Sequence, residues 1–363
     1  MLRMRADLIP ASDDLWTATI RELPHDVYHL ASYARLCARL EGGEAKAFVA
    51  TEDGHTFFVP LIIRTLPSHL SDAQPLRDAT VPYGYPGPLT LFAGGRTAAP
   101  PNDFLCSAVQ AMVIRLQREG IVSAFLRLHP LLPLDVTPLS RIGSVVQSGE
   151  TVAIDLALSD DELWRQMRSN HRRDVTKARS RGETAVNDSS WSEFREFLRA
   201  YRESMERVDA HSYYNFSDDY FDDLRSALGD HLHLWIARSG SDVTAAALFT
   251  ESNGIVQYHL GGTFNRFLPM NPIKLLFHCA ASWFKSRGNR WLHLGGGVGG
   301  ARDSLMHFKL GFSAQTFPFY TCRMVLDPTL YNELSERAGA MNNSSSSFFP
   351  AYREPIRAGQ VGG

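Results

Sequence analysis

Long apolar runs and clustered cysteines are both missing from this sequence of 363 residues. No stretch approaches the roughly 20 apolar residues that a membrane-spanning helix needs, so we expect no membrane span. Residues 1–14 are charged and no apolar run follows them, which argues against a secretory signal. The cysteines are far apart and form no CxxC pair that would indicate a metal or redox site: Cys37, Cys106, Cys279 and Cys322. These absences predict a reducing, cytoplasmic compartment and no metal site.

A large excess of either charge is also missing. Lysine and arginine number 37 against 39 aspartate and glutamate residues, which gives a formal net charge of −2. The surface as a whole therefore does not attract polyanions, and a nucleic-acid partner would have to meet a local basic patch. The sequence has no HExxH, GxSxG or Walker motif, so metalloproteases, α/β-hydrolases and P-loop enzymes are not indicated.

What is present is typical of a globular protein with two domains. Apolar residues make up 44% of the sequence and charged residues 21%, and the length suits two domains of roughly 150 to 200 residues. Helical and strand patterns alternate, which predicts an α/β fold with mixed sheets. We expect an N-terminal domain over residues 1–150, a C-terminal domain over 151–340 and a Ser-rich tail over 341–363. Within the tail, residues 348–353 could dock back onto the protein.

The pattern of apolar and turn residues predicts the individual elements. In the first half, we expect a hairpin closed by Glu52-Asp53-Gly54, with helices and strands at 32–40, 45–51, 56–65, 103–119 and 121–128. The second half predicts a long helix at 161–181 after a strand at 151–158. It continues with helices at 191–207, 218–228, 272–287 and 304–310, and with strands at 233–238, 243–251, 255–261, 290–294 and 316–325.

A run of glycines, Gly295-Gly296-Gly297-Val298-Gly299-Gly300, lies between a predicted strand and a predicted helix. It formally satisfies the dinucleotide-binding pattern GxGxxG. That motif also needs a second strand and an acidic residue about 20 positions later, where Phe319 and Tyr320 stand instead. We therefore favour a glycine turn that allows close backbone approach, with dinucleotide binding as the weaker alternative.

The helix after this loop carries a lysine. Leu305, Phe308 and Phe312 have the spacing of a core-facing stripe, and Lys309 lies about 100° around the helix from Phe308. A lone lysine at such a place is usually solvated. Here it follows a loop whose exposed backbone N–H groups suit anionic or carbonyl oxygens, so a functional role is the alternative.

The helix predicted at 161–181 is strongly basic. One stripe contains Arg165, Arg168, Arg172 and Arg179, and a neighbouring stripe contains Arg173, Lys177 and Arg181. Apart from Asp174, acidic partners are scarce along both stripes. A solvated cationic face and a phosphate-contacting patch are both consistent with this pattern. Aromatic residues beyond it belong to the core or line a pocket: Tyr201, Tyr213, Tyr214, Phe216, Tyr220 and Tyr258, with His259.

Several of these segments together resemble the Fem-type aminoacyltransferases and their relatives in the GNAT superfamily. The resemblance rests on residues 164–182 (WRQMRSNHRRDVTKARSRG), 201–216, 258–263 (YHLGGT), 292–297 (LHLGGG) and 304–312 (SLMHFKLGF), and more weakly on 59–61 and 83–89. It implies two tandem GNAT-like domains with the donor site in the C-terminal one. The long coiled-coil arm of some members is missing here, which leaves acceptors other than a cell-wall precursor open.

The resemblance also implies an activity and site residues. Fem-type enzymes move an amino acid from aminoacyl-tRNA to an amine of a small molecule or peptide, with no further cofactor. The family's Phe-Lys pair matches Phe308 and Lys309, with Lys309 implied at the aminoacyl ester or tRNA end. Arg172 or Arg173 is implied at acceptor phosphates. The remaining candidates for substrate binding are Lys177, Tyr214, Tyr258, Gly296 and Gly297.

The predicted mechanism is direct aminolysis of the activated ester. Backbone N–H groups or Lys309 would hold the oxyanion, and His259 or Asp303 would take the amine proton. An acyl-CoA-dependent N-acyltransferase is the alternative, although the loop at 262–271 lacks the usual (Q/R)xxGx(G/A) phosphate cradle. A GNAT-derived binding module without catalysis is a third possibility. Lys309→Ala separates it from an enzyme, because loss of all activity without loss of ligand binding would speak against a module.

Overall fold

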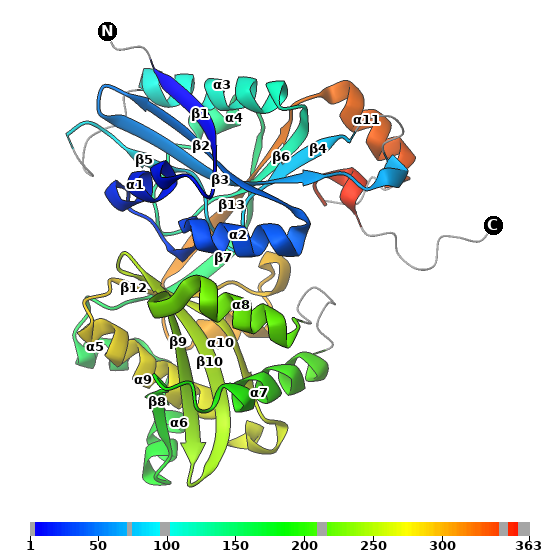
Figure 1. Ribbon diagram of the computed structural model, residues 1–363. Coiled ribbons are helices and arrows are strands. Elements are labelled where there is room, and N and C mark those ends of the chain that lie inside the picture. Colours follow the sequence, from blue (N-terminus) through cyan, green and yellow to red (C-terminus); the bar gives the residue numbers. More distant parts are fainter. Residues whose placement is uncertain (1–3, 71–74, 95–101, 209–215, 341–347, 355–363) are drawn as a thin grey trace. The chain divides into compact units, whose positions relative to one another are not determined.

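The computed structural model describes residues 4–70, 75–94, 102–208, 216–340 and 348–354. The chain divides into two compact units. Unit 1 consists of residues 1–147 together with 320–363, and unit 2 of residues 148–319. Both units have the mixed α/β architecture that the sequence predicts, with helices packed on a mixed sheet (Figure 1).

Unit 1 is built on a sheet with the strand order β1-β2-β3-β4-β6-β13, and β5 adds to the edge of β3. Most neighbours are antiparallel, but β4 and β6 run parallel, with helix α3 between them in the chain. The strands are β1 (Arg5–Pro10), β2 (Gly43–Glu52), β3 (His55–Thr65), β4 (Arg77–Thr80), β5 (Leu89–Leu91), β6 (Ile121–Arg127) and β13 (Thr316–Val325). The α-helices are α1 (Asp14–Glu22), α2 (Ala31–Glu41), α3 (Asn102–Arg118), α4 (Thr137–Ser140) and α11 (Pro328–Arg337), with short 3₁₀ turns at Val27–His29, Ser68–Leu70 and Ala351–Arg353.

Alternation along β3 explains why unit 1 has helices on both faces of its sheet. Phe57 packs toward α3 with Met112, whereas Phe58 packs on the opposite side with Trp16 of α1. Successive side chains of a strand point to opposite faces, and here both faces are apolar. The expected hairpin is confirmed: β2 and β3 pair in register up to Glu52 and His55, and Asp53 and Gly54 both have positive φ, as a tight two-residue turn requires.

Unit 2 has the strand order β7-β12-β11-β10-β9-β8. Its strands are β7 (Ser144–Asp155), which begins just before the boundary, β8 (Thr184–Asn187), β9 (Leu232–Ser239), β10 (Asp242–Ser252), β11 (Ile255–Thr263) and β12 (Trp291–Gly295). Its α-helices are α5 (Asp160–Gln166), α6 (Ser169–Ser180), α7 (Phe194–Arg207), α8 (Asp218–Leu228), α9 (Pro272–Ser286) and α10 (Ser304–Lys309). Among the described residues of this unit, 3₁₀ segments lie at Gly229–His231, Asn265–Met270 and Val298–Gly300.

Helices cover both faces of the sheet in unit 2 (Figure 1). On one face, α9 inserts Phe277 and Phe284 against Phe249 of β10. On the other, α7 approaches β11 so closely that a Cβ added at Gly262 would meet the backbone of Ala200. Strand β11 therefore lies between two helical layers, and its last residues are held from both sides.

The structural units differ from the expected domains at the C-terminal end. Residues 320–340, which we expected in the second domain, group with unit 1, because β13 pairs with β6 from Thr321 to Val325 and α11 follows it. The docking expected for residues 348–353 is found, with Tyr352 buried and Arg353 paired to Asp78. Residues 341–347 and 355–363 of the predicted tail lie outside the described residues.

The single helix predicted at 161–181 is wrong. It is two helices, α5 and α6, because Met167 and Arg168 have extended backbone angles. Arg172 stabilises this break: its Nη1 donates to the carbonyl oxygens of Arg165 and Met167, at 2.7 and 2.9 Å. Orphan carbonyls at the end of a helix need such a donor. Arg165 is therefore not on one continuous stripe with Arg172 and Arg179.

Candidate functional site

The candidate site lies at the carboxyl ends of the parallel strands β11 and β12. Their ladder pairs Ile255 with Trp291 and ends, within the described strands, at Gln257 and His293. Strand β11 then continues to Thr263, with an irregularity opposite Leu248 and Phe249 of β10 that leaves His259 as an extra residue. In open α/β sheets, ligands bind outside the carboxyl ends of parallel strands, where the connecting loops leave room.

The glycine loop at the end of β12 is shaped by close backbone contacts. A Cβ on Gly296 would lie 2.6 Å from the carbonyl oxygen of Glu150, and one on Gly297 would collide with Ala301 and Asp303. A side chain at either position would displace backbone, so only glycine fits. The glycine-turn interpretation thus agrees with the geometry.

Lys309 reaches back from α10 to this loop. Its Nζ donates a 2.6 Å hydrogen bond to the carbonyl oxygen of Gly296, and the side chain is buried, with 6% of the residue exposed. Within the described residues, no carboxylate lies within 4.0 Å of the ammonium group. Burial lowers the pKa of Lys309 to about 8, although the charge of Asp303 opposes this. The expectation of a solvated lysine is wrong.

The buried face of α10 agrees only in part with the predicted one. Phe312 is buried and Phe308 packs against the core, as expected, whereas Leu305 is 38% exposed. Met306 and Lys309 are buried instead. Helix α10 is only 6 residues long. We infer that the contacts of Lys309 and Met306 set its orientation more than the spacing of its apolar residues does.

Asp303 holds the loop and the helix together. It is the N-cap of α10: Oδ1 accepts from the backbone N–H of Met306 at 2.8 Å, and Oδ2 accepts from that of Val298 at 2.9 Å. Burial alone would raise the pKa of Asp303, but these N–H groups hold it below the usual value. Both oxygens are thus engaged, and a carboxylate stabilised in its charged form is a weak proton acceptor.

An aromatic cluster on the α9 side joins Phe308 to Tyr258. Phe277 lies between them, with ring centroids 4.7 Å from Tyr258 and 6.1 Å from Phe308. The hydroxyl of Tyr258 lies beside Gly261, where an added Cβ would be 2.8 Å away. Burial raises the pKa of Tyr258 to about 12, so its hydroxyl stays protonated at neutral pH. Tyr258 therefore follows directly after the last residue pair of the β11–β12 ladder, and its substrate contact stays a prediction.

His259 faces the other layer. Its Nε2 lies 3.5 Å from the hydroxyl of Tyr220 on α8, and burial lowers its pKa to about 4. The imidazole is neutral at pH 7, and a pKa of about 4 makes it a weak proton acceptor. It lies away from the α9-side cluster that holds Phe308.

The predicted basic residues divide by what they contact. Arg172 is committed to the carbonyls at the end of α5. The side chain of Arg173 is 64% exposed and lies 3.7 Å from Asp174, and Lys177 is exposed. Several other basic side chains have acidic partners that the sequence did not reveal, namely Arg165 with Asp161 and Arg181 with Glu183. Tyr214 and Tyr213 lie outside the described residues.

Sequence reasoning missed three residues that build the site, namely His171, Glu150 and Arg302. His171 of α6 packs edge-on against Phe312 and contacts the carbonyl oxygen of Phe308, 3.1 Å away. Glu150 of β7 forms an ion pair with Arg302, and its backbone carbonyl oxygen packs closely against Gly296. These contacts join segments 130 or more positions apart, as the His171–Phe308 and Glu150–Arg302 pairs show. A local sequence pattern carries no signal for them.

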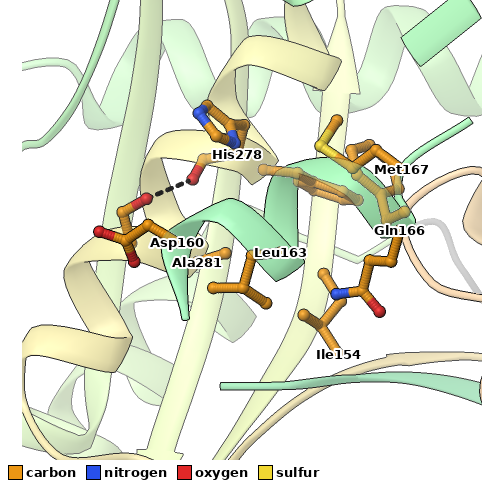
Figure 2. Close-up of a pocket in the computed structure, with 10 residues that line it drawn as sticks. Ile154, Asp160, Leu163, Gln166, Met167, His278 and Ala281 are labelled. Atoms are coloured by element: carbon orange, nitrogen blue, oxygen red, sulfur yellow. Dashed lines mark hydrogen bonds between the residues drawn. The ribbon is translucent and has the colours of Figure 1, made fainter. Parts of the chain in front are cut away.

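A small pocket lies beneath α5 (Figure 2) and shares Phe277 with the aromatic cluster. It has a volume of about 30 Å³ and is lined by Leu163 and Met167 of the α5 region, Ile154 of β7, and His278 and Ala281 of α9, among others. That volume holds about one water molecule, so this pocket is too small for an acyl donor. Within the described residues, no group of three or more His, Cys, Asp or Glu side chains could hold a metal ion, and no helix could span a membrane.

Part of the chain matches a known family model. Residues 165–309 match the model described as acetyltransferase (GNAT) domain. The matched stretch runs from α5 to Lys309, so it contains the glycine loop and the ends of β11 and β12. This stretch is therefore similar to a GNAT acetyltransferase domain, and the fold is GNAT-like. Among curated proteins, no relative matches the sequence.

Solved structures narrow the fold further. The chain is similar to FemX, with a TM-score of 0.68 over 90% of this chain and 99% of that one, at 14% identity. It is also similar to the C-terminal domain of a proposed lysylphosphatidylglycerol synthetase from Agrobacterium fabrum (TM-score 0.52, 13% identity, 86% of this chain and 92% of that one). A protein of unknown function from Bacteroides thetaiotaomicron gives a TM-score of 0.52 at 11% identity, over 89% and 100%. The tandem GNAT-like fold is thereby shown.

Proposed function

We propose that the protein forms an amide bond by transferring an aminoacyl group from aminoacyl-tRNA to an amine of a small molecule or peptide. The observation that carries this proposal is Lys309, a buried ammonium group bonded to Gly296 at the carboxyl end of β12. A positive charge in a place poor in water interacts strongly with charge that develops nearby. Acyl transfer develops such charge on the acyl oxygen.

The reaction needs positioning and charge more than covalent chemistry. The acceptor amine forms a C–N bond to the acyl carbon, the ester C–O bond breaks, and the amine proton passes to the departing ribose oxygen or to solvent. Lys309 stabilises the tetrahedral oxyanion, while Asp303 fixes the loop and helix that position it. Because an ester is already activated, orientation and electrostatic stabilisation supply most of the rate. Tyr258 is proposed to contact the substrate.

The similarity to FemX and the exposed basic side chains of α6 support a tRNA donor. Arg173 and Lys177 lie on the exposed side of that helix and suit phosphate contacts. The test is product analysis after incubation with a mixed pool of charged tRNAs and amine acceptors, with acyl-CoAs in a parallel reaction. Transfer of an amino acid from tRNA supports the proposal. Transfer from acyl-CoA alone contradicts it.

A second candidate is an acyl-CoA-dependent N-acyltransferase. The match of residues 165–309 to the acetyltransferase (GNAT) domain favours it. The same chemistry at Lys309 would serve a thioester donor, because the oxyanion is the same. The two candidate functions differ in how the protein binds the phosphates of the donor. The parallel reactions with charged tRNAs and acyl-CoAs distinguish them.

A further inference from the structure

A carboxylate from a neighbouring helix lies at the N-terminus of α9. Helix α9 connects the parallel strands β11 and β12, so its first turn follows the carboxyl end of β11. A helix N-terminus in this position is a natural place for a phosphate, because N–H groups and the helix dipole both favour negative charge. The first turn of α9 has no acidic residue of its own.

Asp174 of α6 supplies the missing negative charge. Its Oδ2 accepts a 2.6 Å hydrogen bond from the Nζ of Lys274, in the first turn of α9, and lies 3.4 Å from the side-chain amide of Asn271, the N-cap. The side chains of Asp174 and Lys274 are 13% and 9% exposed. A carboxylate oxygen thus occupies the place that a phosphate oxygen would take beside this lysine.

The backbone around this turn offers little else to an anion. Pro272 at the first helical position has no N–H group, and the N–H of Lys274 donates to the carbonyl oxygen of Asn271 at 3.1 Å. Neither Asn271 nor Pro272 is a glycine that would let a diphosphate approach the backbone closely. A donor that needs its diphosphate held here would have to displace Asp174 from a nearly buried ion pair and break its hydrogen bond to Lys274.

We infer that Asp174 is a specificity-determining residue that closes the N-terminus of α9 to the diphosphate of a nucleotide-linked donor such as coenzyme A. This rests on the proposed function for the identity of the preferred donor. Of the two candidate donors, it favours aminoacyl-tRNA, whose ester does not need a diphosphate bound at this turn.

Calorimetric titration of the full-length protein with inorganic pyrophosphate and with coenzyme A tests this inference without any transfer assay. Wild type is expected to bind neither at millimolar concentration. Asp174→Asn and Asp174→Ser remove the carboxylate and are expected to bind pyrophosphate at least tenfold more tightly than wild type. In the double variant Asp174→Asn/Lys274→Met, the gain should disappear.

Two results would overturn the inference. One is saturable binding of coenzyme A to wild type that Lys274→Met abolishes, since the turn would then be open. The other is a folded Asp174→Ser variant, shown by circular dichroism, without any gain. Where neither single variant folds, the wild-type titrations decide alone. A failure of tRNA-dependent transfer would not change these titrations. The proposed function and the proposed role of Asp174 are therefore tested independently.

Discussion

At the level of single residues, Lys309 is buried without a carboxylate partner among the described residues. Lys309 keeps its charge at neutral pH, since its pKa of about 8 lies above 7. Its position costs stability, because a buried charge gives up hydration for a single backbone carbonyl. Such a cost is typical of groups retained for chemistry rather than for folding.

This cost predicts a pH-dependent stability. The pKa of Lys309 is about 8 in the folded protein and near 10.5 when unfolded, so the unfolded chain binds more protons between these values and stability rises with pH. Lys309→Met should therefore stabilise the protein by a few kcal/mol at pH 7, and by less as the pH rises from 8 to 10. Urea unfolding at pH 7 and 9.5, with Lys177→Met as control, measures this. A gain that does not change with pH would contradict it.

The two adjacent arginines of α6 should behave differently. Arg173 is exposed, so Arg173→Ala together with Lys177→Ala should weaken tRNA binding and lower the salt slope by about one for each phosphate that the variant no longer neutralises. Arg172 serves the carbonyls at the end of α5, so Arg172→Ala should cost about 1–3 kcal/mol of stability instead. Binding titrations at several salt concentrations and urea unfolding separate the two. The reverse outcome would place the phosphate contact at Arg172.

At the scale of elements, the sequence predicts those with strong local signals. The β2–β3 hairpin follows from Asp53-Gly54, and β9, β10, β11, α9 and β12 lie close to their predicted ranges. The elements β1, α1 and α11 were not predicted. The break between α5 and α6 also escaped prediction, because an arginine seven positions away caps it. Burial of Lys309 was not predictable either, since it depends on Gly296, which lies 13 positions earlier in the loop after β12.

The glycine loop yields a prediction at this scale. Gly296→Ala should push the loop away from Glu150 and remove the anchor of Lys309, with a loss of activity of at least 100-fold. Gly299→Ala is the matched control: it has φ +61 and open space, so it should cost only about 1 kcal/mol of stability. Transfer rates and unfolding curves of both variants provide the comparison. Equal activity in the two variants would mean that the loop does not position Lys309.

At the scale of the whole chain, the C-terminal segment completes unit 1. Arg353 donates a 3.1 Å hydrogen bond to the fully buried Asp78, which also pairs with Arg64 at 2.9 Å, and the hydroxyl of Tyr352 lies 2.7 Å from that of Ser123. The sequence suggested that this segment docks, but not that it supplies a counter-charge. The partner strand β4 lies almost 280 positions earlier in the chain.

Loss of this counter-charge should destabilise unit 1. Arg353→Met is expected to lower the free energy of unfolding by about 1–3 kcal/mol, because Asp78 keeps one arginine and loses the other. The exposed Arg118→Met should change it by less than about 0.5 kcal/mol. Urea unfolding followed by circular dichroism measures both. Equal stability of the two variants would show that Arg353 contributes no more than a surface residue.

Lys309 is proposed to stabilise the transition state of transfer from an ester donor. Single-turnover transfer from charged tRNA, with wild type and Lys309→Met under saturating enzyme, tests it most directly when tRNA affinity is measured alongside. We expect the rate to fall by roughly 100- to 1,000-fold, with tRNA affinity within about threefold of wild type. A rate that stays within a few fold of wild type would contradict the claim and remove Lys309 from the chemistry.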